Sequence, residues 1–268
     1  MKMNKNKVGS LCAMMMSVMV SQTTLAQNQG DWADSKHVSV AVEPEDKWQF
    51  TVAPYLWAAG INGKIGINGF VSEADVPFSK VFKSLDFAGF LAGEARKGNW
   101  IVLGDFQYVK NSLSNDLTHG GLGASVDLLS EQVKVAMALG YVLYEDEAHF
   151  LRAHVGAQYS YVNSEVTFNG PGPLGGLKSS KGWVDPFIGM KYDYRFHPKW
   201  SLGFLGDVGG FGVSSDELWQ LMGIVAYDLN PKWKLLAGYR IQSIDYSEGG
   251  FLFDVDTEGF LLGAKYQF

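Results

Sequence analysis

The last stretch of the chain, residues 258–268, alternates between two kinds of side chain. Counting back from Phe268 in steps of two gives only apolar or aromatic residues, and the positions between them are mostly small or polar. Side chains alternate between two faces along a β-strand, so this pattern predicts a strand with one apolar and one mixed face. The rest of the chain must then supply the partner strands.

Nine earlier segments show the same alternation. With the terminal one, the predicted strands are residues 48–57, 86–96, 100–108, 132–143, 151–161, 188–196, 200–208, 219–228, 233–242 and 258–268. Short connections (97–99, 145–148, 197–199 and 230–232) alternate strictly with long ones (60–85, 111–127, 163–182, 209–216 and 245–256). Short turns at one end and long loops at the other are expected of a membrane-spanning β-barrel. A water-soluble β-sandwich also alternates but gives no reason for this asymmetry.

The first long connection holds the one convincing helix of the mature chain. Residues 77–85 place Phe78, Phe82 and Leu85 at helical spacing, with Pro77 in the first turn. We expect this helix to pack on the rim against lipid or to fold into the barrel mouth. If the glycine-rich stretch 60–69 forms a hairpin of its own, or one strand pair merges, the count becomes twelve or eight strands rather than ten.

Aromatic residues recur at both ends of the predicted strands. Trp100, Trp200 and Trp233 each follow a short turn directly. The residues expected at the opposite rim are Trp57, Tyr108, Tyr161, Trp183 and Trp219. Aromatic girdles at the two headgroup levels are typical of membrane barrels.

The start of the chain predicts export. Lysines precede an apolar run of about thirteen residues, too short to span a bilayer, and a small-x-small site ends at Ala26. We therefore assign residues 1–26 to a signal peptide, 27–47 to a polar periplasmic tail and 48–268 to the barrel. Loss of the peptide removes the single cysteine, Cys12, and three lysines, which leaves 19 basic and 28 acidic residues and a net charge of −9. This charge argues against nucleic-acid binding.

These patterns predict an all-β protein, a transmembrane antiparallel up-and-down β-barrel of about ten strands with one short helix in the first external loop. Export without a membrane-spanning helix leaves a closed barrel as the spanning structure. We expect it in the outer membrane of a Gram-negative bacterium, in contact with lipid and lipopolysaccharide, with both termini in the periplasm.

The face opposite the apolar one carries charges of both signs. The predicted interior polar network consists of Glu94, Arg96, Asp105, Lys134, Arg152, His154, Lys191, Asp193, Arg195, Asp207, Arg240 and Lys265, with Lys234 on the same face. Charges inside a narrow barrel must pair or meet water. We therefore expect a salt-bridged interior that blocks flow and a structural or surface role. The alternative is a narrow channel for small polar solutes, with Arg96, Arg152 and Arg240 lining it.

No catalytic, metal or cofactor site is predicted. His119 with Asp116 is the one acid–histidine pair in the external loops, and His154 has no serine paired with it in sequence. Asp254 and Asp256 are of the type that binds divalent cations but match no defined motif. We expect a protein that is not an enzyme.

Several segments resemble a family of uncharacterised proteobacterial outer-membrane β-barrel proteins, small barrels of the porin-like or opacity-like kind. They are Pro54-Tyr55-Leu56-Trp57, Gly206-Asp207-Val208-Gly209-Gly210-Phe211-Gly212, Gly238-Tyr239-Arg240 and Tyr266-Gln267-Phe268. The resemblance implies the fold and the location but no activity. It also implies that Phe260, Leu262, Tyr266 and Phe268 form the signal read by the outer-membrane barrel assembly machinery.

Overall fold

The computed structural model describes residues 47–67, 70–117, 124–169 and 176–268. The predicted signal peptide and the predicted tail, apart from its last residue, lie outside the described residues. His119 lies outside them as well.

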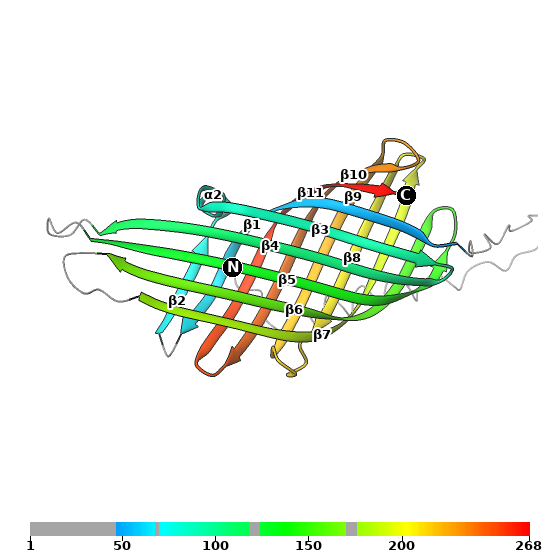
Figure 1. The fold of residues 1–268 in the computed structure, drawn as a ribbon. Coiled ribbons are helices and arrows are strands. Elements are labelled where there is room, and N and C mark those ends of the chain that lie inside the picture. Colours follow the sequence, from blue (N-terminus) through cyan, green and yellow to red (C-terminus); the bar gives the residue numbers. More distant parts are fainter. Residues whose placement is uncertain (1–46, 68–69, 118–123, 170–175) are drawn as a thin grey trace, which may run out of the picture. The chain divides into compact units, whose positions relative to one another are not determined.

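Within the described residues the chain forms eleven strands and one helix (Figure 1). They are β1 (Gln49–Ile67), β2 (Phe70–Val76), α2 (Phe78–Lys83), β3 (Leu85–Lys97), β4 (Trp100–Leu117), β5 (Ala124–Glu145), β6 (His149–Asn169), β7 (Gly176–His197), β8 (Trp200–Gly209), β9 (Glu217–Asp228), β10 (Trp233–Glu248) and β11 (Phe251–Gln267). Each strand of the ring is antiparallel to its neighbours, and β11 pairs with β1 to close it. Because β2 pairs only with β1, the barrel itself has ten strands, as predicted.

The outer face of the ring is apolar over its middle. Leu56, Met137, Phe260 and Leu262 point outward and are between 61% and 69% exposed. A water-soluble protein rarely exposes so wide an apolar surface, whereas a barrel in a bilayer faces hydrocarbon there. The chain is therefore a transmembrane β-barrel.

The two ends of the barrel differ. We call the end with the connections β3–β4, β5–β6, β7–β8 and β9–β10 the turn end, and the opposite end the loop end. The turns at the turn end are short, and the tight β3–β4 turn places Gly98 at a φ of +58°. These turns match the four short connections predicted.

Toward the loop end the two faces of the wall exchange polarity. On β10 the inward residues change from Arg240 and Gln242 to Ile244 and Tyr246, which are all buried. On β11 the outward residues change from Phe260 to the exposed Glu258, Asp256 and Asp254 toward the loop end. An apolar inside and a polar outside are what water on the outer surface requires, so these strands continue beyond the apolar band.

Three of the connections predicted as long loops are therefore mainly strand. The predicted loop 111–127 belongs largely to β4 and β5, and the loop 163–182 to β6 and β7. In the predicted loop 245–256 only Gly249 and Gly250 lie between β10 and β11, with φ values of +58° and +81°. Such a turn between antiparallel strands favours glycine at both positions.

The first connection forms a hairpin and a helix. Residues 61–67 of this stretch do take part in a hairpin, because β1 extends to Ile67 and pairs with β2. The strand count of the barrel is unchanged, since β2 has no second partner among the paired strands. The helix α2 is shorter than predicted, and no described helix is long and apolar enough to cross a membrane.

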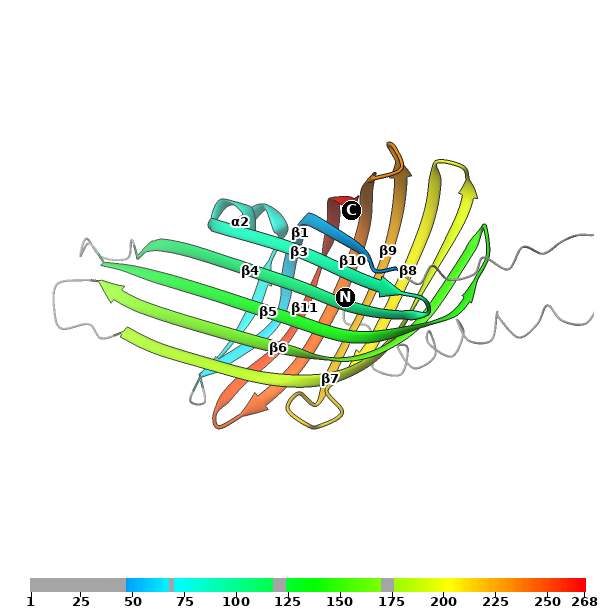
Figure 2. The ribbon, with the colours of Figure 1, turned by 45° about the vertical axis from the view of Figure 1, so that its right-hand side comes forward.

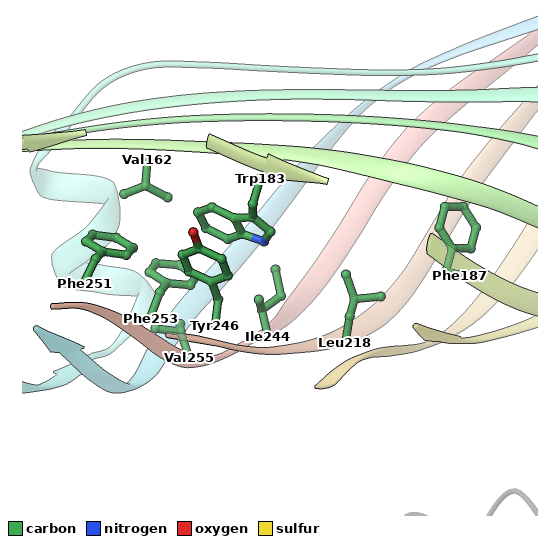
Figure 3. Close-up of a cluster of buried hydrophobic side chains, with 9 residues drawn as sticks. All are labelled: Val162, Trp183, Phe187, Leu218, Ile244, Tyr246, Phe251, Phe253 and Val255. Carbon is green, nitrogen blue, oxygen red and sulfur yellow. The ribbon is translucent and has the colours of Figure 1, made fainter. Parts of the chain in front are cut away.

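A core of aromatic and aliphatic side chains lies inside the strands at the loop end (Figure 3). Its buried members are Val162, Trp183, Phe187, Leu218, Ile244, Tyr246, Phe251, Phe253 and Val255. We call this set the loop-end core. Figures 1 and 2 show from two directions that, at the loop end, strands β4–β7 extend away from strands β10, β11, β1 and β2. The loop-end core joins these two groups, because it takes Trp183 from β7 and Tyr246 from β10.

Two of the aromatic residues expected on the outer rim are inside instead. Trp183 is 5% exposed in the loop-end core, and the ring of Trp57 lies under the guanidinium group of Arg240. Both side chains are inside because Trp57 and Trp183 occupy inward-facing positions of their strands. At the turn end, by contrast, Trp100, Trp200 and Trp233 are exposed and pack against neighbouring tyrosine rings.

Candidate functional site

The interior of the barrel contains a cavity of about 210 Å³ that is lined by both polar and apolar side chains. Its lining includes charged or polar side chains from nine of the ten barrel strands, among them Glu94, Asp105, Arg152, His154, Lys191, Asp207, Arg240 and Lys265. Toward the loop end its walls include Phe187 and Leu218 of the loop-end core. The cavity thus lies on the turn-end side of that core.

Ion pairs dominate the turn-end part of this interior. Arg152 Nη1 donates a hydrogen bond of 2.8 Å to Glu94 Oε2, across the strands that separate β6 from β3. Lys191 pairs with Asp193 at 2.8 Å, on the same face of β7. Glu94 and Lys191 are each 21% exposed at the side chain, whereas Arg152 is 6% exposed. These ion pairs are therefore only partly shielded from solvent.

A buried histidine–aspartate pair lies in the middle of the cavity. His154 Nε2 and Asp207 Oδ1 are 2.7 Å apart, and each side chain is 3% exposed. Gln220 donates its amide N–H to the other oxygen of Asp207. The register places Gly189 of β7 directly between His154 of β6 and Asp207 of β8.

Gly189 explains how strands two places apart can form this pair. A Cβ atom built there would lie within 2.6 Å of His154 Nε2 and still closer to Asp207 Oδ1. The missing side chain leaves the space in which the imidazole and the carboxylate meet.

A second group surrounds Asp105. Tyr55 donates its hydroxyl to both oxygens of Asp105, at 2.9 and 3.1 Å, and Gln107 donates its amide at 2.7 Å. Arg240 Nη1 donates to the Tyr55 hydroxyl at 3.4 Å, and the Arg240 guanidinium lies 4.8 Å from the ring centroid of Trp57. The Tyr55 hydroxyl thus links the carboxylate of Asp105 to the guanidinium group of Arg240.

Lys134 and Gln242 connect opposite walls of the barrel. Lys134 Nζ donates a 2.6 Å hydrogen bond to Gln242 Oε1. Their strands, β5 and β10, are five places apart in either direction around the ring of ten, so the bond crosses the full width of the interior. Gln242 also donates its amide to Gln158 Oε1 of β6 at 3.4 Å, and Gln158 bonds Ser160.

The β8–β9 connection packs against β7 beyond the point where β7 and β8 stop pairing. The pairing of β7 with β8 stops at Phe187, and Gly210 N then donates to Pro186 O at 3.0 Å. Asp185, fully buried, accepts 2.7 Å hydrogen bonds from the backbone N–H and the hydroxyl of Ser215. It also accepts the indole N–H of Trp183 at 2.9 Å. One carboxylate therefore fixes both the connection and a ring of the loop-end core.

The twelve residues predicted for the interior network lie at inward-facing positions of their strands. They do not form one continuous cluster. Nine contribute to the pairs and groups just described: Glu94, Asp105, Lys134, Arg152, His154, Lys191, Asp193, Asp207 and Arg240. Lys265 lines the cavity beside them. Arg96 lies at the turn end and bonds Glu145 at 2.9 Å, and Arg195 lies 3.8 Å from Asp228 with its side chain 48% exposed. Asp228 also pairs with Lys234.

Sequence reasoning missed the uncharged members of the interior. Tyr55, Gln107, Gln158, Gln220 and Gln242 supply most of the bonds that connect the charged residues. The alternation along each strand does mark them as inward. What it could not show is which residue of a distant strand each one meets.

Two histidines near the start of β6 each have a hydrogen-bond partner. His149 Nδ1 lies 2.7 Å from the Tyr192 hydroxyl, and His154 is bonded to Asp207. Asp254 and Asp256 are exposed on the outer face of β11. Over the described ranges, no three histidine, cysteine, aspartate or glutamate side chains are grouped as a metal site would need.

The residues predicted to form the assembly signal lie on the outer face of the last strand. Phe260, Leu262 and Phe268 are 69%, 61% and 69% exposed, and the Tyr266 ring packs against Trp233 and Phe268. The backbone N–H of Phe268 donates to Phe50 O at 3.0 Å, beside the closing β1–β11 pair.

Comparisons with known proteins agree with this fold. No protein-family model matches the chain, and no curated protein matches it. Among solved structures, the chain is similar to the outer membrane protease OmpT from Escherichia coli, with a TM-score of 0.52 and 11% identity over 85% of this chain and 99% of that one. At this identity the likeness shows the fold alone.

Two other solved structures are more distant. The translocator domain of autotransporter NalP from Neisseria meningitidis has a TM-score of 0.44 and 10% identity, with 98% of each chain covered. A major outer membrane protein from Thermus thermophilus has a TM-score of 0.42 and 15% identity, with 83% of this chain and 100% of that one covered.

Proposed function

We propose that the protein is an integral outer-membrane β-barrel with an occluded interior, that it is not an enzyme, and that its role is structural or at the cell surface. The observation that carries this proposal is the hydrogen bond of 2.6 Å between Lys134 and Gln242. It joins opposite walls, and a conduit would need a continuous water-filled path at that level. The loop-end core adds a second obstruction beyond it.

The difference between the two ends of the barrel supports an orientation in the membrane. Outer-membrane barrels have short turns on the periplasmic side and longer extracellular loops, so we place the turn end and the chain termini in the periplasm. Exposed Trp100, Trp200 and Trp233 then lie at the inner headgroup level, where aromatic rings are favoured. Lipid, lipopolysaccharide and the barrel assembly machinery are the partners this placement implies.

The loop end supports a surface role. Its strands continue beyond the apolar band with exposed Asp254, Asp256 and Glu258 on the outside and a packed apolar core inside. Such a section is stable in water and presents a fixed, charged surface. A structural or surface role makes use of this section, and a pore does not need it.

The competing function is a narrow channel for small polar solutes. The cavity of about 210 Å³ favours it, because Arg152, Lys191, Arg240 and Lys265 all contribute to its lining. Such a channel would require the Lys134–Gln242 bond and the loop-end core to open.

Planar-bilayer recording separates the two. Purified protein, shown to be inserted by its resistance to extraction with urea, is expected to give no single-channel steps. Steady steps from the wild-type barrel would overturn the occluded interior. Hydrolysis assays on peptide and lipid substrates test the enzyme alternative, and turnover that disappears in His154→Ala would contradict our proposal.

A further inference from the structure

The barrel wall has a notch between β1 and β3. The two strands pair only from Gln49↔Arg96 to Tyr55↔Phe90. Beyond this, residues 56–60 of β1 pair with β11 alone, and residues 85–89 of β3 do not pair with β1. Five residues of strand correspond to a notch roughly 16 Å long.

Helix α2 covers this notch. A Cβ atom on Gly60 would lie 3.1 Å from Val76 O and 3.3 Å from Phe78 N, so the start of the helix abuts β1. On the other side, Ser112 N of β4 donates a 2.8 Å hydrogen bond to Ser84 O, just after the helix. No residue of α2 is buried, and Phe78 and Phe82 are 41% and 64% exposed. Helix α2 therefore lies over the notch without burying any side chain of its own.

A pocket of about 80 Å³ lies behind the helix. Its walls are mainly apolar and include Phe78 and Phe82 of α2 together with Phe90 and Trp57 of the barrel. Lys134 also lines it, and the indole N–H of Trp57 finds no hydrogen-bond partner among the described residues. The pocket is therefore apolar toward the notch and offers hydrogen-bond donors toward the barrel interior.

The interior beside this pocket carries more positive than negative charge. Lys134 is 8% exposed and forms no ion pair with the residues that the structure describes. Asp105, the nearby carboxylate, is already bonded to Tyr55, which connects it to Arg240. Because buried charges are normally paired, an ammonium group left in this position points to an anionic partner.

We propose that this pocket binds a single-chain carboxylic acid amphiphile from the membrane, a site that goes beyond the structural role proposed above. Its carboxylate meets Lys134 Nζ and the Trp57 indole N–H. Its hydrocarbon chain leaves through the notch, with α2 displaced, and runs along Leu56 and Phe87. These side chains are 63% and 59% exposed on the outer face of β1 and β3.

The small size of the pocket favours a carboxylate over a larger acidic head group. The pocket, of about 80 Å³, is much smaller than the interior cavity of about 210 Å³, and a carboxylate is the smallest acidic head that a single-chain amphiphile offers.

Quenching of tryptophan fluorescence by a mid-chain dibrominated octadecanoic acid tests the proposal on the folded barrel in detergent micelles. We expect saturable quenching in the wild type that is largely lost in Trp57→Phe. In Lys134→Met, the concentration at half-saturation should rise about tenfold or more, the scale of one charge-assisted hydrogen bond. Lys134→Arg should restore most of the affinity.

The matched control is Lys191→Met, which removes an interior lysine that does not line this pocket. It should bind the acid as the wild type does, and the methyl ester should bind the wild type as weakly as the acid binds Lys134→Met. Equal affinity of Lys134→Met and wild type, or quenching that only follows the acid-to-detergent ratio, would overturn the site. A dibrominated lysophospholipid that binds as tightly as the acid would overturn the assignment of the head group. Ion conduction by the wild type would contradict the occluded interior without affecting these binding results.

Discussion

The indole ring of Trp183 and the phenol ring of Tyr246 lie 4.2 Å apart between centroids, with 7° between their planes. Trp183 is on β7 and Tyr246 on β10, strands that are three places apart in the ring and share no hydrogen bonds. The stack is thus a contact between side chains alone, and it joins the two groups of strands that continue past the apolar band.

Replacement of Trp183 by alanine should therefore loosen the loop end. We expect Trp183→Ala to lower the free energy of unfolding by about 3–5 kcal/mol, as large-to-small changes in a core do. Denaturant unfolding in micelles measures it. Trp200→Ala, at an exposed ring of the turn end, is the control and should change the free energy far less. Equal losses in the two variants would mean that the stack does not hold the section together.

Gly189 should tolerate no side chain. Gly189→Ala places a methyl group where His154 and Asp207 meet, so we expect a loss of about 1–3 kcal/mol in the free energy of unfolding. The control is Gly104→Ala, since a Cβ atom on Gly104 has no atom within 4 Å. Chemical denaturation of both variants provides the comparison, and an unaffected Gly189→Ala would refute the described packing.

The C-terminal phenylalanine should matter for assembly more than for stability. Phe268 is 69% exposed, so Phe268→Ala removes little packing inside the barrel. We expect less folded protein in the outer membrane, seen as a loss of the heat-modifiable band on gels, with near-normal refolding in vitro. Phe196→Ala, also exposed at the turn end, is the control. Normal assembly of Phe268→Ala in cells would remove the assembly-signal assignment.

Asp146, in the β5–β6 turn, should titrate as an unusually strong acid. The Tyr144 hydroxyl bonds one carboxylate oxygen at 2.6 Å, and the backbone N–H groups of Ala148 and His149 bond the other. These hydrogen bonds lower the pKa of Asp146. The turn is therefore stabilised at pH values above the ordinary aspartate pKa of ~3.9, and this is lost as the pH falls through the lower value.

A carboxyl-carbon NMR titration of Asp146 tests this. The midpoint should lie below ~3.9 and move up in Tyr144→Phe, because the hydroxyl donor is gone. A midpoint at or above the ordinary value would contradict the hydrogen bonding of the turn.

The membrane part of the fold could be predicted from sequence because apolar outward positions alternate with polar or small inward positions along its strands. Along β10, Leu235 and Tyr239 face outward and Lys234 and Arg240 face inward. The same alternation, with short turns between strands, predicts ten strands and their order.

The loop-end section could not be predicted in this way, because the polarity rule reverses there. Past Gln242, the apolar Ile244 and Tyr246 take the inward phase, and Asp245 takes the outward one. The acidic and glycine-rich residues at 245–256 therefore have the sequence pattern of a loop. Contacts across the interior, such as Lys134 with Gln242, were out of reach because they depend on how the ring closes.

The most direct test of the account is a spin-label scan of β10 in lipid vesicles, one cysteine at a time from residue 233 to residue 248. We predict that odd positions 235–241 are accessible to oxygen dissolved in the bilayer and even positions are not. Asp245 and Ser247 should be accessible to a water-soluble relaxation agent instead. Water accessibility at positions 235–241, or no difference between odd and even positions there, would contradict a lipid-facing barrel that continues into water.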